Sequence, residues 1–338
     1  MMVSYPALHL CAGGKLLKMR VLGTRIVAWW QPLIKETAFA SWTLIKIMVP
    51  VLIITRILEQ FGLVGAVSSF LEPVMNLIGL PGELGLVWAT AILTTLYGAM
   101  AVFATLAPGL ELSVAQVTVL CSAMLVAHSL PIEVSISKKA GAPVVPIIVL
   151  RLGGAVVYCL LLHHFCIGAE LWQQDAEIFW IGPPGNQGHL AWGVGQLMNL
   201  GLIVLVILGV LLIMRVLRAV GILGLMERLL APVVSFLGMT RRAVSVVVVG
   251  MVMGLGIGGA LIIKETGSGK LGKSEIVNSM VLISLCHSLV EDTLVMAALG
   301  GQLGGILWGR MVFSLIATFI IVQVAARLAT AKIVSRSV

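Results

Sequence analysis

One constant spacing relates two long parts of this chain. The tripeptide His-Ser-Leu begins at His128 and again at His287, and we call the spacing between these two positions the repeat offset. Identical residues recur at the repeat offset, without a gap, on both sides of these tripeptides. Further identical pairs include Arg56 and Arg215, Gly62 and Gly221, Gly65 and Gly224, Pro73 and Pro232, Gly79 and Gly238, Gly141 and Gly300, and Arg151 and Arg310. The chain therefore contains an internal duplication and is expected to fold as two related halves.

The apolar character of the chain places these halves in a membrane. Hydrophobic residues make up 59% of the 338 residues and charged residues only 11%, whereas a soluble domain carries about 25% charged residues. A membrane helix needs about 20 residues to cross a hydrocarbon core of ~30 Å. Eight stretches approach that length, at Trp42–Gln60, Leu84–Leu106, Ser113–Leu130, Ala142–Phe165, Val194–Leu217, Ala243–Ile263, Lys273–Val290 and Gly304–Arg327. Because backbone amides in lipid need partners within their own segment, we predict an all-α polytopic membrane protein.

Loop charges predict that the two halves are inverted. The loop after the first apolar segment, residues 57–83, has three Glu and no Lys or Arg, whereas its duplicate, residues 215–242, has five Arg and one Glu. Since basic loops face the cytoplasm, these equivalent loops should lie on opposite sides of the membrane. Basic residues also flank both termini, so we expect both termini in the cytoplasm. The net charge of +8 is explained by these flanks and does not indicate nucleic-acid binding.

The apolar segments and the loop charges together divide the chain into five parts. The expected parts are an N-terminal cytoplasmic or interfacial segment (1–41), a first repeat (42–167), an external linker (168–193), a second repeat (194–327) and a cytoplasmic tail (328–338). Each half has three apolar segments between loops on the same side of the membrane. One segment in each half must therefore be re-entrant or broken, and the sequence leaves open which one.

Glycine and proline mark interruptions within each half. The stretches Gly62–Leu80 and Gly221–Met239 mix apolar and polar residues, and we predict amphipathic helices that lie along the membrane interface. The glycine-rich run Met253–Gly259 and its duplicate Thr94–Gly98 are predicted to be broken segments beside the transport path. Unwound backbone is tolerated inside a membrane only where it is buried or lines a wet cavity. Ordinary close packing of helices through small residues is the alternative.

The His-Ser-Leu copies end an apolar segment in each half and are followed by acidic residues. Glu133 follows the first copy, and Glu291 and Asp292 follow the second. His287 and Glu291 stand in an i, i+4 relation and would share a face of a continuous helix. Ionisable residues inside a membrane indicate a functional site. Hydrogen bonding to a polar substrate, proton relay and metal ligation all remain open, as does simple capping of helix ends at the membrane surface.

A metal site is the weakest of these interpretations of the sequence. The candidate ligands are His128, His287, Glu133, Glu291, Asp292 and Cys286. Their spacing matches no standard metal motif, and the ligands would have to converge across the repeat axis. We therefore predict no bound metal, no cofactor and no catalytic residue, and we do not expect an enzyme.

The duplicated arginines Arg151 and Arg310 lie early in the last segment of each half. They indicate an anion or a partner carboxylate, unless they reach the interface by snorkelling. Asn278 adds a polar group that has no polar counterpart in the first half. The candidate substrate-binding residues are Thr94, Thr95, Tyr97, His128, Ser129, Glu133, Arg151, Gly254, Gly256, Gly258, Asn278, His287, Ser288, Glu291, Asp292 and Arg310.

These motifs resemble the nucleoside-recognition, or Gate, domain family of bacterial membrane proteins. The resemblance is carried by Leu71-Glu72-Pro73-Val74, by Gly254–Gly259 and by the two His-Ser-Leu turns, and it covers Trp42 to Arg327 as two copies. Similar domains form the membrane part of ferrous iron transport protein B, are related to concentrative nucleoside transporters, and occur in spore maturation proteins. The resemblance implies transport or membrane assembly, and a location in the inner membrane of a bacterium.

We therefore expect a secondary transporter that moves a small polar or anionic solute by alternating access between the repeats. A non-transporting membrane scaffold or assembly factor and a divalent metal (Fe²⁺) permease are the alternatives. Membrane lipids and the solute are the expected partners, and nucleic acid is not. Coupling to H⁺ or Na⁺ and formation of a homodimer are left open.

Overall fold

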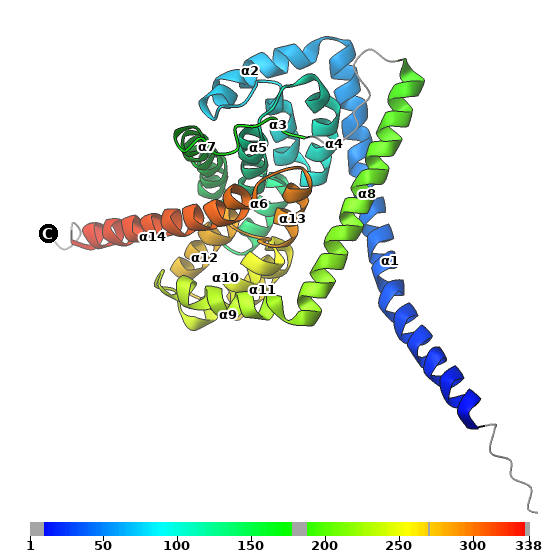
Figure 1. The fold of residues 1–338 in the computed structure, drawn as a ribbon. Helices are drawn as coiled ribbons and strands as arrows, with labels where there is room; N and C mark the ends of the chain where they lie inside the picture. Colours follow the sequence, from blue (N-terminus) through cyan, green and yellow to red (C-terminus); the bar gives the residue numbers. More distant parts are fainter. Residues whose placement is uncertain (1–9, 178–187, 270, 335–338) are drawn as a thin grey trace, which may run out of the picture.

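The chain is helical throughout the part that the structure describes. The computed structural model describes residues 10–177, 188–269 and 271–334, and every regular element in these ranges is a helix (Figure 1). Five helical stretches are long and apolar enough to cross a membrane, at residues 30–60, 114–139, 144–168, 190–220 and 304–325. The predicted all-α polytopic membrane architecture is confirmed.

The two halves have the same order of helices. The first half contains α1 (Leu10–Gln60), α2 (Leu63–Leu77), α3 (Leu84–Leu93), α4 (Leu96–Leu106), α5 (Val114–Val126), α6 (Leu130–Lys139) and α7 (Val144–Gly168). The second half contains α8 (His189–Val220), α9 (Ile222–Ser235), α10 (Arg241–Met253), α11 (Leu255–Gly267), α12 (Lys273–Leu285), α13 (Glu291–Ala298) and α14 (Arg310–Val334). A short π-helix, Gly304–Gly309, leads into α14.

The repeat offset holds for the backbone as well as for the sequence. It relates both ends of α5 to the corresponding ends of α12. Left-handed backbone also recurs at the repeat offset, at Gly62 and Gly221, Gly79 and Gly238, Ser129 and Ser288, and Gly141 and Gly300. Figure 1 shows α2 and its counterpart α9 at opposite ends of the helix bundle, each lying across it.

The predicted breaks in the apolar segments are confirmed. The segment predicted at 84–106 is divided into α3 and α4 at Thr94, and the segment at 243–263 is divided into α10 and α11 at Gly254. Each of these four helices has 10 to 13 residues, so each is about 15–20 Å long and too short to cross a bilayer alone. The expectation of eight comparable spanning segments is corrected to full-length helices combined with half-helices.

The second break depends on close backbone packing. A Cβ atom at Gly258 of α11 would lie 2.3 Å from the Cα atom of Gly250 in α10. No side chain fits between these two helices at that point, so α10 and α11 pack backbone against backbone, as small residues allow in membrane proteins.

The ends of the repeats differ in detail from the predicted boundaries. The first helix, α1, continues without interruption through residue 41, so no helix end separates the N-terminal segment from the first repeat. The linker predicted at 168–193 is described at residues 168–177 and 188–193. Its first part lies against the start of α5, where the Val114 amide donates to the Gln174 carbonyl at 2.9 Å. The tail predicted at 328–338 continues α14 as far as Val334.

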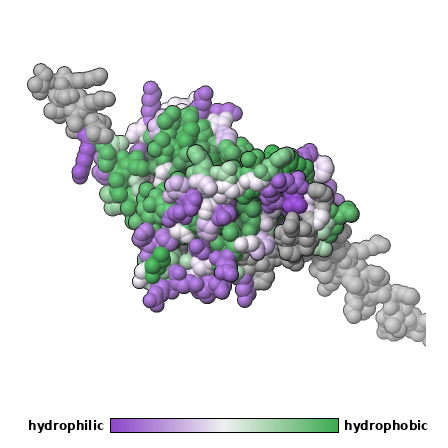
Figure 2. Space-filling model, turned by 90° about the horizontal axis from the view of Figure 1, so that it is seen from above, coloured by the Kyte–Doolittle hydropathy of each residue, from purple (hydrophilic) through white to green (hydrophobic). Residues whose placement is uncertain are grey.

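The outer surface is apolar where lipid would contact it. Large hydrophobic side chains such as Phe70, Phe165, Phe236 and Ile320 are exposed. Figure 2 shows broad areas of apolar side chains on the face seen from above, with hydrophilic side chains gathered into patches. Apolar surface is unfavourable in contact with water, but a bilayer covers it with lipid. This surface therefore agrees with the membrane architecture.

Candidate functional site

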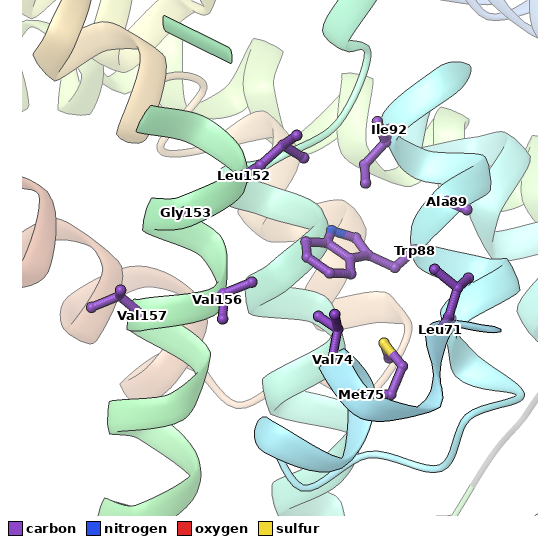
Figure 3. Close-up of a pocket in the computed structure, with 11 residues that line it drawn as sticks. Leu71, Val74, Met75, Trp88, Ala89, Ile92, Leu152, Gly153, Val156 and Val157 are labelled. Atoms are coloured by element: carbon purple, nitrogen blue, oxygen red, sulfur yellow. The ribbon is translucent and has the colours of Figure 1, made fainter. Parts of the chain in front are cut away.

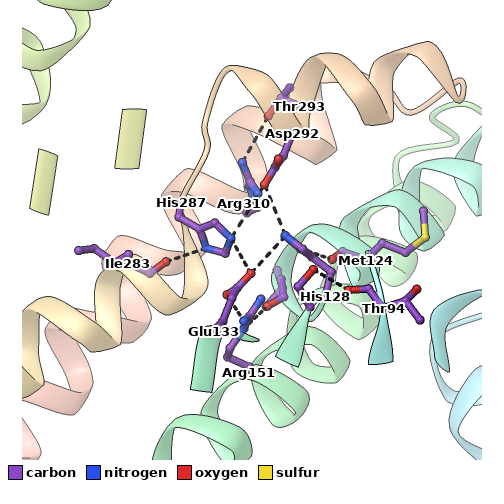
Figure 4. A network of polar contacts seen from close by, with 12 residues as sticks. Thr94, Met124, His128, Glu133, Arg151, Ile283, His287, Asp292, Thr293 and Arg310 are labelled. Atoms are coloured by element: carbon purple, nitrogen blue, oxygen red, sulfur yellow. Dashed lines mark hydrogen bonds and ion pairs between the residues drawn. The ribbon is translucent and has the colours of Figure 1, made fainter. Parts of the chain in front are cut away.

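The two His-Ser-Leu turns, which are far apart in the sequence, meet inside the protein. The imidazole rings of His128 and His287 have centroids 5.1 Å apart and are only 6% and 2% exposed. The first ring follows the end of α5, and the second follows the end of α12. Figure 4 shows both rings directed at the same carboxylate.

Each histidine is oriented by a carbonyl one helical turn earlier. His128 Nδ1 lies 2.9 Å from the carbonyl oxygen of Met124, and His287 Nδ1 lies 2.9 Å from that of Ile283. A carbonyl oxygen can only accept a hydrogen bond, so Nδ1 carries the hydrogen in both rings. In the uncharged imidazole, Nε2 is then the atom with the free electron pair.

Both Nε2 atoms face the carboxylates. Glu133 Oε1 lies 3.3 Å from His128 Nε2 and 3.2 Å from His287 Nε2. Asp292 Oδ2 lies 3.6 Å and 3.9 Å from the same two nitrogens. Donor atoms of His128, Glu133 and His287 all lie within 4.8 Å of one another. We call His128, Glu133, His287 and Asp292 the central cluster.

The central cluster takes equal contributions from the two halves. The repeat offset relates Glu133 to Asp292, as it relates the two histidines. Each half therefore supplies one imidazole and one carboxylate. His287 and Glu291 do not share a helix face, because α12 ends at Leu285 and α13 begins at Glu291, so the continuous helix that their i, i+4 spacing would need is absent.

The two equivalent arginines are both completely buried but have different partners. Arg151 donates from Nη1 to Glu133 Oε2 and from Nε to the Val126 carbonyl at 3.0 Å. Arg310 donates from Nη2 to Thr293 Oγ1 at 3.3 Å. Its Nε and Nη1, and Asp292 Oδ2, have no hydrogen-bond partner in the described part of the chain. The snorkelling alternative is wrong, since both arginine side chains are fully buried.

The broken segments hold the two turns in place. Ser129 donates from its amide to the Ala91 carbonyl and from Oγ to the Thr94 carbonyl, both at 2.8 Å. In the second half, the Leu289 amide donates to the Met251 carbonyl at 2.7 Å. A Cβ atom at Gly254 would lie 2.5 Å from Ser288 Oγ. Each turn therefore packs against the break in its own half.

Ser129 and Ser288 both have a φ of 47°, which is unfavourable for any residue with a side chain. We expect Ser129→Ala to lower the free energy of unfolding by about 1 kcal/mol, because it removes the hydrogen bond to Thr94. Ser288→Ala is the matched control, since its hydroxyl makes no hydrogen bond within the described residues. The midpoint of thermal unfolding in detergent compares the two, and equal shifts would contradict the assigned role of the Ser129 hydroxyl.

The remaining predicted site residues lie outside the central cluster. Thr95 caps the start of α4 by accepting from the Gly98 amide at 3.1 Å, and Tyr97 follows in the same helix, partly buried. Gly256 belongs to the first turn of α11, and Gly258 contacts Gly250 instead of the turns. The others are Asn278 in the middle of α12, Glu291 at the start of α13, and Cys286, which is buried beside His287.

Sequence reasoning missed Thr293 and the orienting carbonyls. Thr293 follows Asp292 directly and receives the hydrogen bond from Arg310. Its equivalent in the first half is Val134, so a search restricted to residues that are identical at the repeat offset does not find it. Every residue has the same backbone carbonyl, so the sequence does not single out Met124 and Ile283. Only the helix geometry identifies their carbonyls as the partners of the histidines.

A separate pocket has a different character. It lies between α2, α3 and α7, has a volume of about 490 Å³, and contains no charged side chain (Figure 3). Its lining residues are Leu71, Val74, Met75, Gly85, Trp88, Ala89, Ile92, Leu152, Gly153, Val156 and Val157. The Trp88 indole nitrogen donates to the Ala123 carbonyl at 3.2 Å, so it is not available to a ligand. This lining suits hydrocarbon, and the polar chemistry is concentrated in the central cluster.

Comparisons with known proteins identify a domain in the first half of the chain. The family model described as nucleoside recognition, named Gate, matches residues 41–149, which include His128 and Glu133. The chain is 27% identical over 267 residues to the uncharacterized membrane protein YvoD of Bacillus subtilis (strain 168), a match that covers 77% of this chain and 83% of that protein. No solved structure matches the chain. The resemblance predicted from the sequence is therefore confirmed for the first of the two predicted copies: residues 41–149 of this polytopic membrane protein match the nucleoside-recognition, or Gate, domain.

Proposed function

We propose that this protein is a secondary transporter of the bacterial inner membrane that moves a small polar or anionic solute by alternating access between two inverted repeats. The observation that carries the proposal is the central cluster, in which buried ionisable side chains from both halves converge. Such residues are costly inside a membrane and mark transport pathways. Transporters built from repeats bind their solute at the interface of the repeats, between broken helices.

Two observations support an inverted relation between the repeats. The equivalent helices α2 and α9 lie at opposite ends of the bundle in Figure 1. The stretch of chain that contains α2 is acidic, whereas the stretch that contains α9 carries Arg228, Arg241 and Arg242. The positive-inside rule then puts α9 and both termini on the cytoplasmic side.

The unequal arginines fit a protein that alternates between two states. Arg151 binds Glu133, but its equivalent Arg310 has no bond to a carboxylate in the described structure. Alternating access moves one repeat against the other around a fixed site, and we infer a second state in which the two repeats exchange the contacts seen here. In that exchanged state, Arg310 would pair with Asp292 and Arg151 would release Glu133. The released carboxylate would then be free to bind H⁺ or Na⁺ for coupling.

Flux measurements in proteoliposomes test the proposal. We expect the wild-type protein to transport at least one member of a panel of labelled nucleosides and small organic anions. His128→Ala combined with His287→Ala should reduce the rate by at least about tenfold, which corresponds to a loss of about 1.4 kcal/mol of stabilisation. His163→Ala combined with His164→Ala is the matched control. The centroids of these two imidazole rings also lie close together, at 5.4 Å, but both residues are on α7, outside the central cluster.

Each outcome has a clear meaning. Wild-type rates in the His128 and His287 double variant, with the protein still folded by size-exclusion chromatography, would overturn the site assignment. Absence of flux for every solute in the panel, with correctly inserted wild-type protein, would overturn the transport proposal and favour a scaffold.

A further inference from the structure

The central cluster brings electron-pair donors together with no hydrogen between them. Each histidine uses its Nδ1 hydrogen on a carbonyl, so the two Nε2 atoms point bare electron pairs at Glu133 Oε1. A carboxylate oxygen also carries only electron pairs. Two imidazole nitrogens and two carboxylates therefore face one another in a buried space, and only a cation placed between them makes the arrangement favourable.

The separations match those of a metal centre. Zinc-type ions bind histidine nitrogen and carboxylate oxygen at about 2.0–2.1 Å in a tetrahedral arrangement, which places neighbouring ligand atoms about 3.3–3.4 Å apart. The distances from Glu133 Oε1 to the two Nε2 atoms are 3.2 and 3.3 Å. Asp292 Oδ2 lies slightly farther away, at 3.6 and 3.9 Å, within reach of a small side-chain rotation.

The surrounding groups orient these donors as the supporting shell of a metal site does. In such sites, the nitrogen that does not bind metal donates to a carbonyl or carboxylate, which fixes the ring. Both histidines of the central cluster meet this condition. Arg151 holds the second oxygen of Glu133, and this contact turns Oε1 toward the histidines. Asp292 Oδ2 is buried and has no hydrogen bond within the described residues, so it is free to act as a ligand.

We propose that the central cluster binds one divalent transition-metal cation, with His128, His287, Glu133 and Asp292 as its four ligands. Two imidazoles and two carboxylates select ions such as Zn²⁺, Fe²⁺, Co²⁺ or Mn²⁺ over Mg²⁺ and Ca²⁺, which prefer oxygen ligands alone. The ion would lie where the two repeats meet. This proposal goes beyond the proposed transport function, because it does not depend on which solute is carried.

Binding of Co²⁺ to the purified full-length protein tests the proposal directly. We expect one equivalent of Co²⁺ per chain to produce the visible absorption bands of a four-coordinate ion, without the thiolate-to-cobalt band that a cysteine ligand would add. Zn²⁺ should displace Co²⁺, and Mg²⁺ should not. His128→Ala and His287→Ala should each weaken binding by more than the roughly 10–100-fold that is typical for loss of a supporting contact.

Two neighbouring substitutions are the matched controls. Cys286→Ser and Glu291→Gln alter potential ligands that directly precede His287 and Asp292 in the chain but lie outside the central cluster, so both variants should bind Co²⁺ as the wild type does. Asp292→Asn should weaken binding and change the spectrum. If the folded wild-type protein binds no Co²⁺ at neutral pH, the cation between the donors is a proton and the proposal is wrong. That result would leave the transport measurement, which is made without added metal, unaffected.

Discussion

Arg151→Met is expected to lower the free energy of unfolding by about 3–5 kcal/mol, because it leaves the carboxylate of Glu133 buried without its partner. The Arg151 side chain is fully buried, and its guanidinium bonds both Glu133 and the Val126 carbonyl. Denaturant unfolding in detergent, followed by tryptophan fluorescence, measures the change. Glu133→Gln in the same chain should recover much of the loss, since the uncharged amide tolerates burial better than a lone carboxylate.

Arg310→Met provides the matched comparison. Arg310 occupies the equivalent position and is equally buried, but it bonds only the Thr293 hydroxyl and keeps two nitrogens without hydrogen-bond partners in the described structure. Replacing a poorly paired buried charge by an apolar side chain is often neutral, so we expect a loss of less than about 1 kcal/mol. If Arg151→Met and Arg310→Met lower the free energy of unfolding equally, the two arginines are not paired unequally in the detergent-solubilised protein.

Gly258→Ala is expected to have the second large effect. It should lower the free energy of unfolding by about 3 kcal/mol, at the upper end of the range for overpacking. The added Cβ atom would lie 2.3 Å from Gly250 Cα, and a backbone atom cannot move aside as a side chain can. Helix α11 must then shift away from α10, which also disturbs the contact between Gly254 and Ser288. Reduced transport should therefore accompany the reduced stability.

Gly267→Ala is the control for Gly258→Ala within the same helix. A Cβ atom at Gly267 meets no atom within 4 Å, so the substitution should leave the unfolding free energy within about 1 kcal/mol of the wild-type value. Similar losses at Gly258 and Gly267 would contradict close packing of α10 on α11. Thermal unfolding of both variants in the same detergent makes the comparison.

The sequence predicts the fold well because membrane constraints are local. Apolar length, glycine breaks and the repeat offset can be seen directly along the chain, and they place the breaks at Thr94 and Gly254 correctly. Helix ends are harder to predict, since a helix such as α12 can stop inside an apolar stretch. That stop at Leu285 removes the helical relation between His287 and Glu291.

The pairing of site residues depends on contacts between the halves, which periodicity cannot predict. The sequence offers Glu133, Glu291 and Asp292 as similar acidic neighbours of the turns. The structure brings Glu133 and Asp292 to the histidines, and these are the two acids that the repeat offset relates. The repeat offset, applied to the acids, would have selected them. The different partners of Arg151 and Arg310 could not be inferred in this way, because the two arginines are identical in the sequence and differ only in the neighbours that the fold brings to them.

The equal division of the central cluster has a consequence for the ancestry of the chain. A chain with a single repeat would carry one of the two histidines and one of the two carboxylates, so it could assemble the four-donor arrangement only by pairing with a second molecule. Joining two copies in one chain makes that encounter intramolecular, which raises the effective concentration of each half near the other. Fusion also lets each copy diverge, as Thr293 opposite Val134 already illustrates.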